Sequence, residues 1–347
     1  MEILLIEFVT GGGWQRWFPG EPLPGGSLRR EGQAMLAAVA TDLARIAGCR
    51  LHVMRDTRLA ATLPLAGCQV HDVADACQFD TCVQRLAGRV DWCLPIAPEL
   101  GGALTEVASL LRAAGGRVLL PDEQALRTAS DKHATALALA AAGVPVPDGR
   151  ALAAGDPLPL DAMYPLVVKP RDGAGSEDVR LVASAVAARG VHVERPSRCE
   201  VYCPGMAASV SCLAGPAGST LLPACRQRLS DDGRFVYLGG RHPLPQAEAE
   251  RAARLAAAAI EVLRPGGGWL GVDLVLGADP AGGADRVIEV NPRLTTSYVG
   301  LRAACPANLA AALVAAAEGA RPELSFRPEA IEFDADGRVR HLAGALD

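Results

Sequence analysis

Lysine is almost absent from the 347-residue sequence. Only Lys132 and Lys169 are lysines among the 34 Lys and Arg residues, and the other 32 are arginines. A composition that uses arginine wherever solubility alone matters indicates that a surviving lysine is needed as a lysine. A compact ammonium group on a flexible chain suits a point contact with a phosphate, where a guanidinium fork would be bulkier. Both lysines are therefore candidate anion-binding residues.

Clusters of positive charge and long apolar runs are also missing. The net charge is −5 without a basic run, which excludes duplex nucleic acid and anionic membrane surfaces as favoured partners. Apolar runs stay below the roughly 18 residues that span a bilayer, and the start MEILLIEFVTGGGW lacks signal-peptide features. The ten cysteines form no CxxC pair and no Cys/His metal-ligand spacing. We therefore expect a soluble, cytoplasmic protein with reduced thiols.

The first 120 residues alternate short apolar runs with Ala- and Leu-rich stretches of helical character. This rhythm predicts βα units and a parallel sheet. A triple glycine, Gly11–Gly13, follows the first predicted strand but does not fit the G-x-G-x-x-G fingerprint. We interpret it as a ligand-facing loop. The predicted strands are 3–9, 50–54, 91–95 and 117–120, and the helices between them include 31–47 and 102–114.

Residues beyond Pro121 have a different pattern, in which glycine-rich turns join strands. Ser130 is the predicted N-cap of a helix over 131–142, and the turn Ser230–Gly233 predicts a hairpin. Asp336-Gly337 predicts a second hairpin near the end of the chain. The other expected elements are strands at 164–170, 199–203, 209–214, 270–276 and 286–290 and helices at 247–263 and 307–318.

Three groups of residues carry candidate chemistry. Lys132 stands at the head of a helix, and Lys169 ends a strand. The loop 172–176 (DGAGS) is rich in glycine, so its backbone N–H groups can approach an anion and the loop can close over it. Glu289 and Asn291 are two residues apart and so share one face of a strand. Together with Asp273 on a neighbouring strand, their oxygen atoms suit Mg²⁺, and Arg293 adds a cation.

In this order, the motifs resemble the ATP-grasp superfamily of carboxylate–amine ligases. The resemblance covers about 131–318 and rests on the phrases SDK (130–132), PLVVKP (165–170), GAGS (173–176), CEVYCPG (199–205), GVD (271–273) and IEVNPR (288–293). It implies an α/β fold, α+β in the ATP-grasp part, with a Rossmann-like pre-ATP-grasp domain before a two-subdomain ATP-grasp fold. The implied boundaries are 1–120 for the first domain, 121–195 and 196–328 for the small and large subdomains, and 329–347 for a C-terminal hairpin or tail.

The resemblance also implies a role for each matching residue. Lys132 and Lys169 would hold the phosphates of ATP, and Arg293, with Lys169, would act in catalysis by stabilising the transferring phosphoryl group. One departure is the stretch 206–208 (MAA), where many relatives have an acidic residue that binds ribose. The remaining implied residues are Gly173, Ala174, Gly175 and Ser176 over the phosphates, Glu200, Val201, Tyr202 and Cys203 at the adenine, and Asp273, Glu289 and Asn291 around Mg²⁺ or Mn²⁺.

The phrases 6–13 (IEFVTGGG), 237–240 (YLGG) and 291–300 (NPRLTTSYVG) narrow the resemblance. They look like the tyramine–glutamate ligase group of methanofuran biosynthesis and its bacterial relatives in one-carbon metabolism. This implies that L-glutamate and tyramine or tyrosine give a γ-glutamyl amide, ADP and phosphate. Arg226 and Arg228 are further site candidates, or they belong to an ordinary solvated face. The expected acceptor pocket comprises Thr10, Gly11, Gly12, Gly13, Arg293, Thr295, Thr296, Ser297, Tyr298 and Arg302.

Three alternatives remain open from the sequence. The first is another ATP-grasp amino-acid or dipeptide ligase, although Gly271 stands where the D-alanine group has an arginine. The second is an ATP-binding regulatory protein that no longer turns over, against which the complete set of carboxylates argues. The third is an NAD-dependent oxidoreductase, for which the N-terminal glycines supply no site. Small-molecule substrates are the expected partners, and a homodimer is left open because relatives often dimerise.

Overall fold

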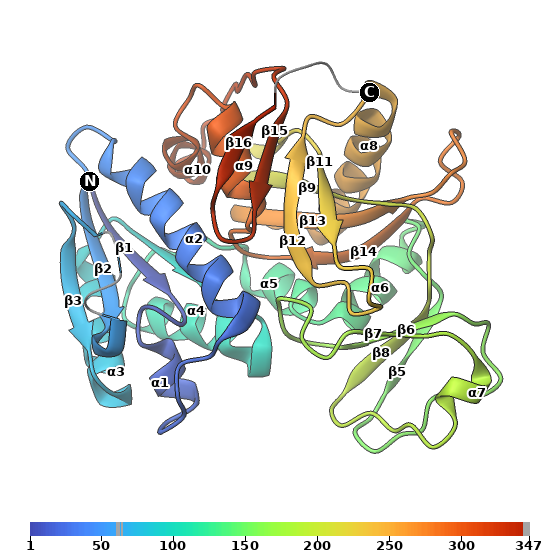
Figure 1. Ribbon diagram of the computed structural model, residues 1–347. Helices are drawn as coiled ribbons and strands as arrows, with labels where there is room; N and C mark the ends of the chain where they lie inside the picture. The colour runs from blue at the N-terminus through green and yellow to red at the C-terminus, as the bar shows by residue number, and fades with distance from the viewer. Residues whose placement is uncertain (60–62, 64, 343–347) are drawn as a thin grey trace.

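Three β-sheets make up the framework of the computed structural model, which describes residues 1–59, 63 and 65–342 (Figure 1). The last five residues of the predicted tail, 343–347, lie outside the described residues. The N-terminal sheet is parallel, in the order β3-β2-β1-β4, as the βα rhythm predicts. The stretch 117–120 contributes only a bridge between Cys93 and Val118. The strands are β1 (Glu2–Glu7), β2 (Arg50–Asp56), β3 (Gln69–Val73) and β4 (Trp92–Ile96).

Strand β3 is absent from the sequence-based prediction because it is an edge strand with only Val73 buried, so it lacks an apolar run. The helices of this region pack on both faces of the sheet. The longest, α2, lies between the sheet and the C-terminal helices α9 and α10 in Figure 1, and it contacts both. Its buried residues join theirs in one core. The helices are α1 (Gly13–Trp17), α2 (Gly26–Ala44), α3 (Ala76–Leu86), α4 (Ala103–Ala113), α9 (Ser297–Ala304) and α10 (Leu309–Ala317), with short 3₁₀ turns at Thr57–Leu59, Ala87–Arg89 and Leu100–Gly102.

The second sheet is small and antiparallel, in the order β5-β8-β6-β7. Helix α6 precedes it, and its N-cap is Asp131 rather than the predicted Ser130. Asp131 has extended backbone angles, and its Oδ1 accepts hydrogen bonds from the amides of His133 and Ala134, whereas Ser130 is still helical as the C-cap of α5. The elements are α5 (Glu123–Ala129), α6 (Lys132–Ala141), β5 (Gly149–Leu152), β6 (Leu166–Pro170), β7 (Arg180–Val182), α7 (Ala185–Ala188) and β8 (Ser197–Val201).

The third sheet runs β14-β13-β9-β11-β12-β15-β16, and β10 pairs with β9. Helix α8 contacts β9, β13 and β14. The hairpin predicted about Asp336-Gly337 is formed, and its first strand extends this sheet by pairing with β12. The strands are β9 (Met206–Gly215), β10 (Gly218–Leu221), β11 (Cys225–Leu229), β12 (Tyr237–His242), β13 (Gly268–Leu276), β14 (Arg286–Asn291), β15 (Ile331–Asp334) and β16 (Val339–His341), and α8 is Gln246–Leu263.

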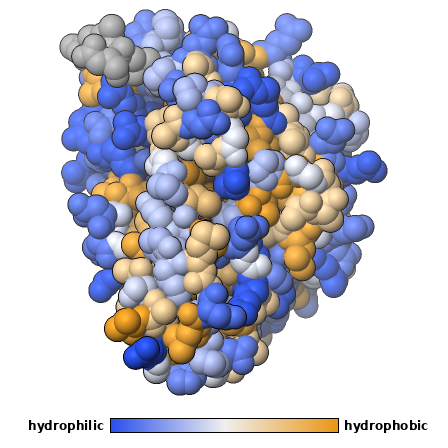
Figure 2. Space-filling model, turned by 90° about the vertical axis from the view of Figure 1, so that its right-hand side faces the viewer, coloured by the Kyte–Doolittle hydropathy of each residue, from blue (hydrophilic) through white to orange (hydrophobic). Residues whose placement is uncertain are grey.

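The surface, the helix lengths and the cysteines add three observations. On the face shown in Figure 2, apolar residues form patches that polar residues separate. Within the described part of the chain, no single helix is long and apolar enough to cross a membrane. Helices α9 and α10 have the required length and apolar character only when taken together, and they are bent by 105° relative to each other. All ten cysteines are unpaired, and Cys77 alone is exposed.

Candidate active site

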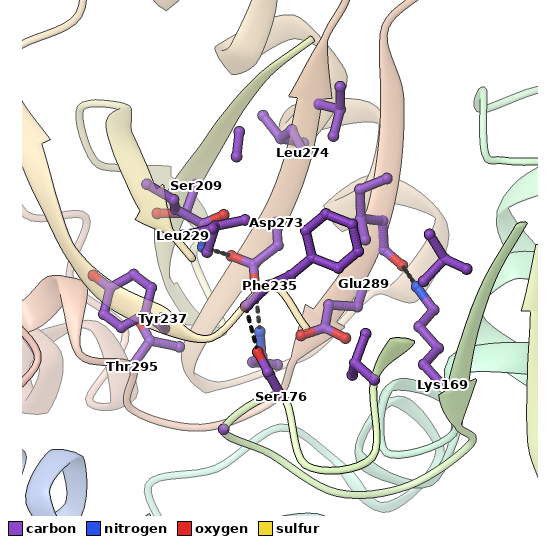
Figure 3. A pocket seen from close by; sticks show the side chains of 18 of the residues that line it. Lys169, Ser176, Ser209, Leu229, Phe235, Tyr237, Asp273, Leu274, Glu289 and Thr295 are labelled. Carbon is purple, nitrogen blue, oxygen red and sulfur yellow. Dashed lines mark hydrogen bonds between the residues drawn. The ribbon is translucent and has the colours of Figure 1, made fainter. Parts of the chain in front are cut away.

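A pocket of about 210 Å³ lies between the small and the large sheet. Its walls combine β6 and β8 of the small sheet with β11, β13 and β14 of the large one, and the glycine-rich loop 172–176 borders it. Figure 3 shows Asp273 and Glu289 in the middle of this pocket, with Lys169 on one side and Tyr237 on the other. Residues that are distant in the sequence thus converge where the two sheets face each other.

The carboxylates of Asp273 and Glu289 are neighbours because β13 and β14 pair in antiparallel register at these two residues. Asp273 accepts hydrogen bonds from Gln227 Nε2 (2.9 Å) and Asn291 Nδ2 (3.0 Å). Burial and then the negative charge of Glu289 raise the pKa of Asp273 to about 8. Burial also acts to raise the pKa of Glu289, but the charges of Lys132 and Lys169 outweigh it and lower the pKa. The site therefore holds an ionised carboxylate, Glu289, beside Asp273, whose negative charge a bound cation would stabilise.

These residues fit a magnesium ion by their chemistry. Among the described residues, no group of three or more His, Cys, Asp or Glu side chains could hold a metal. Mg²⁺, however, typically takes only one or two protein carboxylates and completes its shell with waters and substrate phosphates. The adjacent carboxylates of Asp273 and Glu289, with the side-chain amide of Asn291 beside them, supply that donor set.

Both lysines act on Glu289 by their charge, but in the described part of the chain only Lys132 forms an ion pair with it. Lys169 is 3% exposed, and its Nζ lies 2.5 Å from Glu200 Oε1 and donates to the carbonyl of Ile288 at 3.1 Å. Lys132 Nζ donates to the carbonyl of Gly173 at 2.9 Å and lies 3.5 Å from Glu289 Oε2. Lys132 therefore ties the glycine-rich loop to the carboxylate pair.

Three contacts hold the glycine-rich loop in place. Ser27 Oγ on α2 donates to the carbonyl of Gly175 (3.2 Å), and the amide of Gly101 donates to Asp172 Oδ2 (2.8 Å). On the other side, Ser176 Oγ donates to the carbonyl of Phe235 (2.8 Å), in the 230–236 loop. Gly175 has a φ of +71°, and a Cβ on it would lie 2.9 Å from Ser27 Oγ, so this position favours glycine. The loop is thus closed against both the N-terminal region and the large sheet.

An apolar end of the pocket follows strand β8. The rings of Tyr202 and Phe235 stack at 5.9 Å with 19° between their planes, and Val167, Leu274 and Ile288 line the same pocket. The amides of Val201 and Tyr202 donate to the backbone carbonyls of Asp148 and Pro165. Within the described part of the chain, the amide of Cys203 has no such acceptor. A free donor beside apolar side chains and stacked rings suits one edge of a planar heterocycle.

Arg293 is buried, and its guanidinium group is already paired. It donates to both carboxylate oxygens of Glu99 (3.1 to 3.3 Å) and to the carbonyl of Leu294 (3.2 Å). A longer contact of 3.4 Å reaches Asn291 Oδ1. Because Glu99 follows β4 of the first sheet, the N-terminal region fixes the orientation of this cation at the edge of the pocket.

The structure separates the residues expected in the acceptor pocket into two groups. Thr295, Thr296 and Ser297 line the pocket. Tyr298 and Arg302 do not, because both bind Asp42 on α2. Thr10 and Gly11, Gly12 and Gly13 also lie outside it.

The glycine triplet is explained by close packing. Thr10 donates from its amide and hydroxyl to Glu7 Oε2, both at 2.7 Å. Gly12 has a φ of +89°, and a Cβ there would lie 2.4 Å from a methyl group of Val73.

Of the two arginine candidates on β11, Arg228 pairs with Glu332 and Asp334 of β15, and Arg226 is exposed. Gln227 between them is the residue that contacts Asp273.

Sequence reasoning missed several residues that shape the pocket. Glu31 and Glu99 come from the N-terminal region, where nothing in the local pattern separates them from other acidic residues. Phe235 follows the predicted turn at 230–233, where the hairpin predicts a second strand, but it lies in the 230–236 loop with a φ of +54°. Gln227 and Tyr237 are among the further lining residues outside the predicted site set.

Comparisons with known proteins agree with this arrangement. Residues 49–126 match the model of the pre ATP-grasp 3 domain, and residues 129–297 match that of the ATP-grasp domain. Together the two matches cover well over half of the chain. The chain therefore belongs to the ATP-grasp superfamily of ligases, and the predicted α/β architecture of a pre-ATP-grasp domain followed by an ATP-grasp fold is confirmed. No curated protein matches it at a significant level.

Solved structures share the fold at low sequence identity. An ATP-grasp superfamily protein from Archaeoglobus fulgidus is 20% identical, with a TM-score of 0.72 over 96% of this chain and 92% of that one. An L-amino acid ligase from Bacillus licheniformis is 16% identical, with a TM-score of 0.66 over 95% and 78%. Biotin carboxylase from Campylobacter jejuni, solved as a β,γ-ATP complex, is 15% identical, with a TM-score of 0.72 over 95% and 74%.

Proposed function

We propose that this protein is an ATP-dependent carboxylate–amine ligase that forms an amide through an acyl phosphate and releases ADP and phosphate. The observation that carries the proposal is the Asp273–Glu289 pair beside a glycine-rich loop, with Lys132 paired to Glu289 and the charges of both lysines acting on that carboxylate. A carboxylate is a poor electrophile, so amide formation requires its activation. Phosphoryl transfer depends mainly on positioning and charge neutralisation, and these residues supply both.

ATP would lie along the pocket with its base at the apolar end. Adenine would receive a hydrogen bond from the amide of Cys203 and donate to the carbonyl of Val201, with Tyr202 and Phe235 beside it. Glu200 would keep the ammonium group of Lys169 in place rather than contact the base, since the two groups are 2.5 Å apart. With alanines at 207 and 208 in place of an acidic residue, Gln227 and the Tyr202–Phe235 pair are the groups left near the ribose.

Asp273, Glu289 and Asn291 would hold Mg²⁺ or Mn²⁺, which neutralises phosphate charge when bound. Lys132 and Lys169 would hold the phosphates, and Arg293, oriented by Glu99, would stabilise the developing charge on the transferring phosphoryl group. The loop 173–176 would cover the β- and γ-phosphates. An acyl phosphate hydrolyses in water, so the contacts of this loop with Ser27 and Phe235 protect the intermediate.

For the substrates, we propose the γ-carboxyl group of L-glutamate and the amine of tyramine or tyrosine, in the formation of a methanofuran- or methylofuran-type one-carbon carrier. The support is the set of sequence phrases about Tyr237 and Asn291, since Tyr237 and Thr295–Ser297 line the pocket. The amino-acid ligase among the similar structures is in keeping with an amino acid as the acid substrate.

The test is to incubate the purified protein with Mg-ATP, L-glutamate and either tyramine or tyrosine. We expect equal amounts of ADP and of a γ-glutamyl amide identified by mass. ADP release with another acid and amine would retain the ligase and replace its substrates. ATP binding without turnover for any acid and amine would support a silent nucleotide-binding protein and refute the ligase.

A further inference from the structure

Glu31 on α2 places at the pocket a carboxylate oxygen that has no hydrogen-bond partner among the described residues. Its Oε2 accepts a hydrogen bond from Thr296 Oγ1 at 2.7 Å. Its Oε1 is buried and has no hydrogen-bond partner among the described residues. A buried carboxylate oxygen without a donor is costly, so such an atom in a binding pocket points to a ligand that completes it.

Two cations, Arg293 and Arg30, act on Glu31 by their charge, and among the described residues neither forms an ion pair with it. Arg293 contributes a favourable field, but its guanidinium N–H groups point to Glu99, Asn291 and the carbonyl of Leu294. No ion pair within 4.0 Å involves Glu31 in the described part of the chain. Burial raises the pKa of Glu31, as expected of a carboxylate that lacks its counter-ion. A ligand with a cationic N–H donor would supply both the missing hydrogen bond to Oε1 and the missing counter-ion of Glu31.

A small cavity of about 30 Å³ adjoins Glu31. Leu28 and Met35 from α2 and Ile96 and Pro98 from the end of β4 form its apolar walls. Glu31, Gly175 and Arg293 line both this cavity and the main pocket. The second acidic wall residue, Glu7, is already satisfied by the amides of Val9 and Thr10 and by the Thr10 hydroxyl. Within the cavity, Glu31 therefore carries the unsatisfied carboxylate.

We propose that Glu31, at the edge of the main pocket, binds the ammonium group of the acceptor amine. This subsite rests on the proposed ligase function and names the part of the protein that selects its second substrate. Thr296 positions the carboxylate, and Arg293, shared by both spaces, lies between the amine and the site of phosphoryl transfer. The ligand class is a primary amine. Amines that carry a carboxylate, such as tyrosine, would be disfavoured beside Glu31, so this subsite favours tyramine of the two proposed amines.

The experiment compares two nucleophiles in the wild type and in Glu31→Gln. Tyramine is an ammonium ion at neutral pH, whereas hydroxylamine is largely neutral and traps an acyl phosphate as a hydroxamate. We expect Glu31→Gln to lower kcat/KM for tyramine by about 10- to 100-fold, the range for loss of a charge-assisted hydrogen bond, and to leave hydroxamate formation unchanged. Calorimetry with Mg-ADP should show tyramine binding to the wild type about tenfold more tightly than its uncharged analogue tyrosol, a preference that Glu31→Gln should abolish.

The controls separate this subsite from folding and from the ligase itself. Gln33→Ala, on the same helix but beside a different cavity, should change neither reaction, and Glu31→Asp should give an intermediate effect. Equal losses with both nucleophiles, or a wild type that does not prefer tyramine to tyrosol, would overturn the proposal. Absence of both amide and hydroxamate from the wild type would instead refute the proposed function.

Discussion

Replacement of Asp42 should reveal what Arg302 does. Asp42 is 4% exposed, and its carboxylate accepts hydrogen bonds from Arg302 at 2.6 and 2.8 Å and from the Tyr298 hydroxyl at 2.6 Å. These bonds join α2 of the N-terminal region to α9. Burial, and then the charge of Asp42, raise the pKa of Tyr298 well above its usual value, so its hydroxyl remains a donor at any assay pH.

Asp42→Ala would leave a half-buried guanidinium and a buried hydroxyl without an acceptor. Removal of one partner from a buried ion pair costs about 3–5 kcal/mol. An unfolding entropy of roughly 2.1 cal/mol/K per residue gives about 0.7 kcal/mol/K for this chain, so Tm should fall by roughly 4–7 °C. Arg302→Ala should also lower Tm, by less, because the carboxylate retains Tyr298.

The assay is differential scanning calorimetry combined with steady-state kinetics below the lower Tm. The matched control is Arg45→Ala. Arg45 is largely exposed, and its contact with the Asp42 carboxylate is long, at 3.8 Å, so this pair contributes little to stability. We expect the KM values for ATP and for both substrates to change by less than twofold in every variant. An Arg302→Ala protein with unchanged Tm and a tenfold higher KM for glutamate would refute this reasoning and restore the substrate role expected from the sequence.

Three further substitutions test the pocket, and a labelling experiment tests the cysteines. Glu289→Gln should reduce kcat at least about 100-fold in an ADP-release assay, because it removes a carboxylate that would hold Mg²⁺ at the phosphates; unchanged kcat would contradict the proposed metal site. Phe235→Ala should raise the KM for ATP by roughly 3- to 10-fold, in line with about 0.5–1.5 kcal/mol for one aromatic contact, and should leave the KM for the acid unchanged. Glu99→Gln should lower both Tm and kcat, because Arg293 loses its counter-ion; a normal kcat would show that Glu99 does not position it. Cys77 should react first with a thiol reagent at pH 8, whereas Cys225, whose pKa burial raises to about 12, should react only after unfolding.

Local patterns in the sequence predict one half of the site well. The alternation of a strand places Glu289 and Asn291 on one face, and the structure pairs them with Asp273. The scarcity of lysine directs attention to Lys132 and Lys169, and the charges of both act on Glu289. In each case the prediction rests on a few consecutive residues or on unusual composition, so it can be made without knowledge of tertiary contacts.

The other half depends on contacts between distant segments, which local patterns do not encode. Glu31 meets Thr296 across 265 positions, and Glu99 meets Arg293 across 194. On β11, two arginines attracted attention by their charge, but the phase of the strand directs Gln227 to Asp273. The triple glycine of 11–13 is likewise explained by the close approach of Val73 and Phe8. A glycine needed for packing has the same sequence signature as one needed for a ligand.

The balance of charge explains why the N-terminal region is part of the site. Among the described residues, each cation of the pocket faces a carboxylate: Lys132 faces Glu289, Lys169 faces Glu200, and Arg293 faces Glu99. Two further carboxylates, Asp273 and Glu31, have no ion-pair partner, and burial raises the pKa of both. A pocket that keeps two buried carboxylates without counter-ions is incomplete until two cations arrive. In an amide-forming ligase those cations are the metal that accompanies ATP and the ammonium group of the amine. Under the proposed function, Glu31 on α2 would let the first domain select the amine, while the two sheets behind it would bind the nucleotide and the acid that ATP activates.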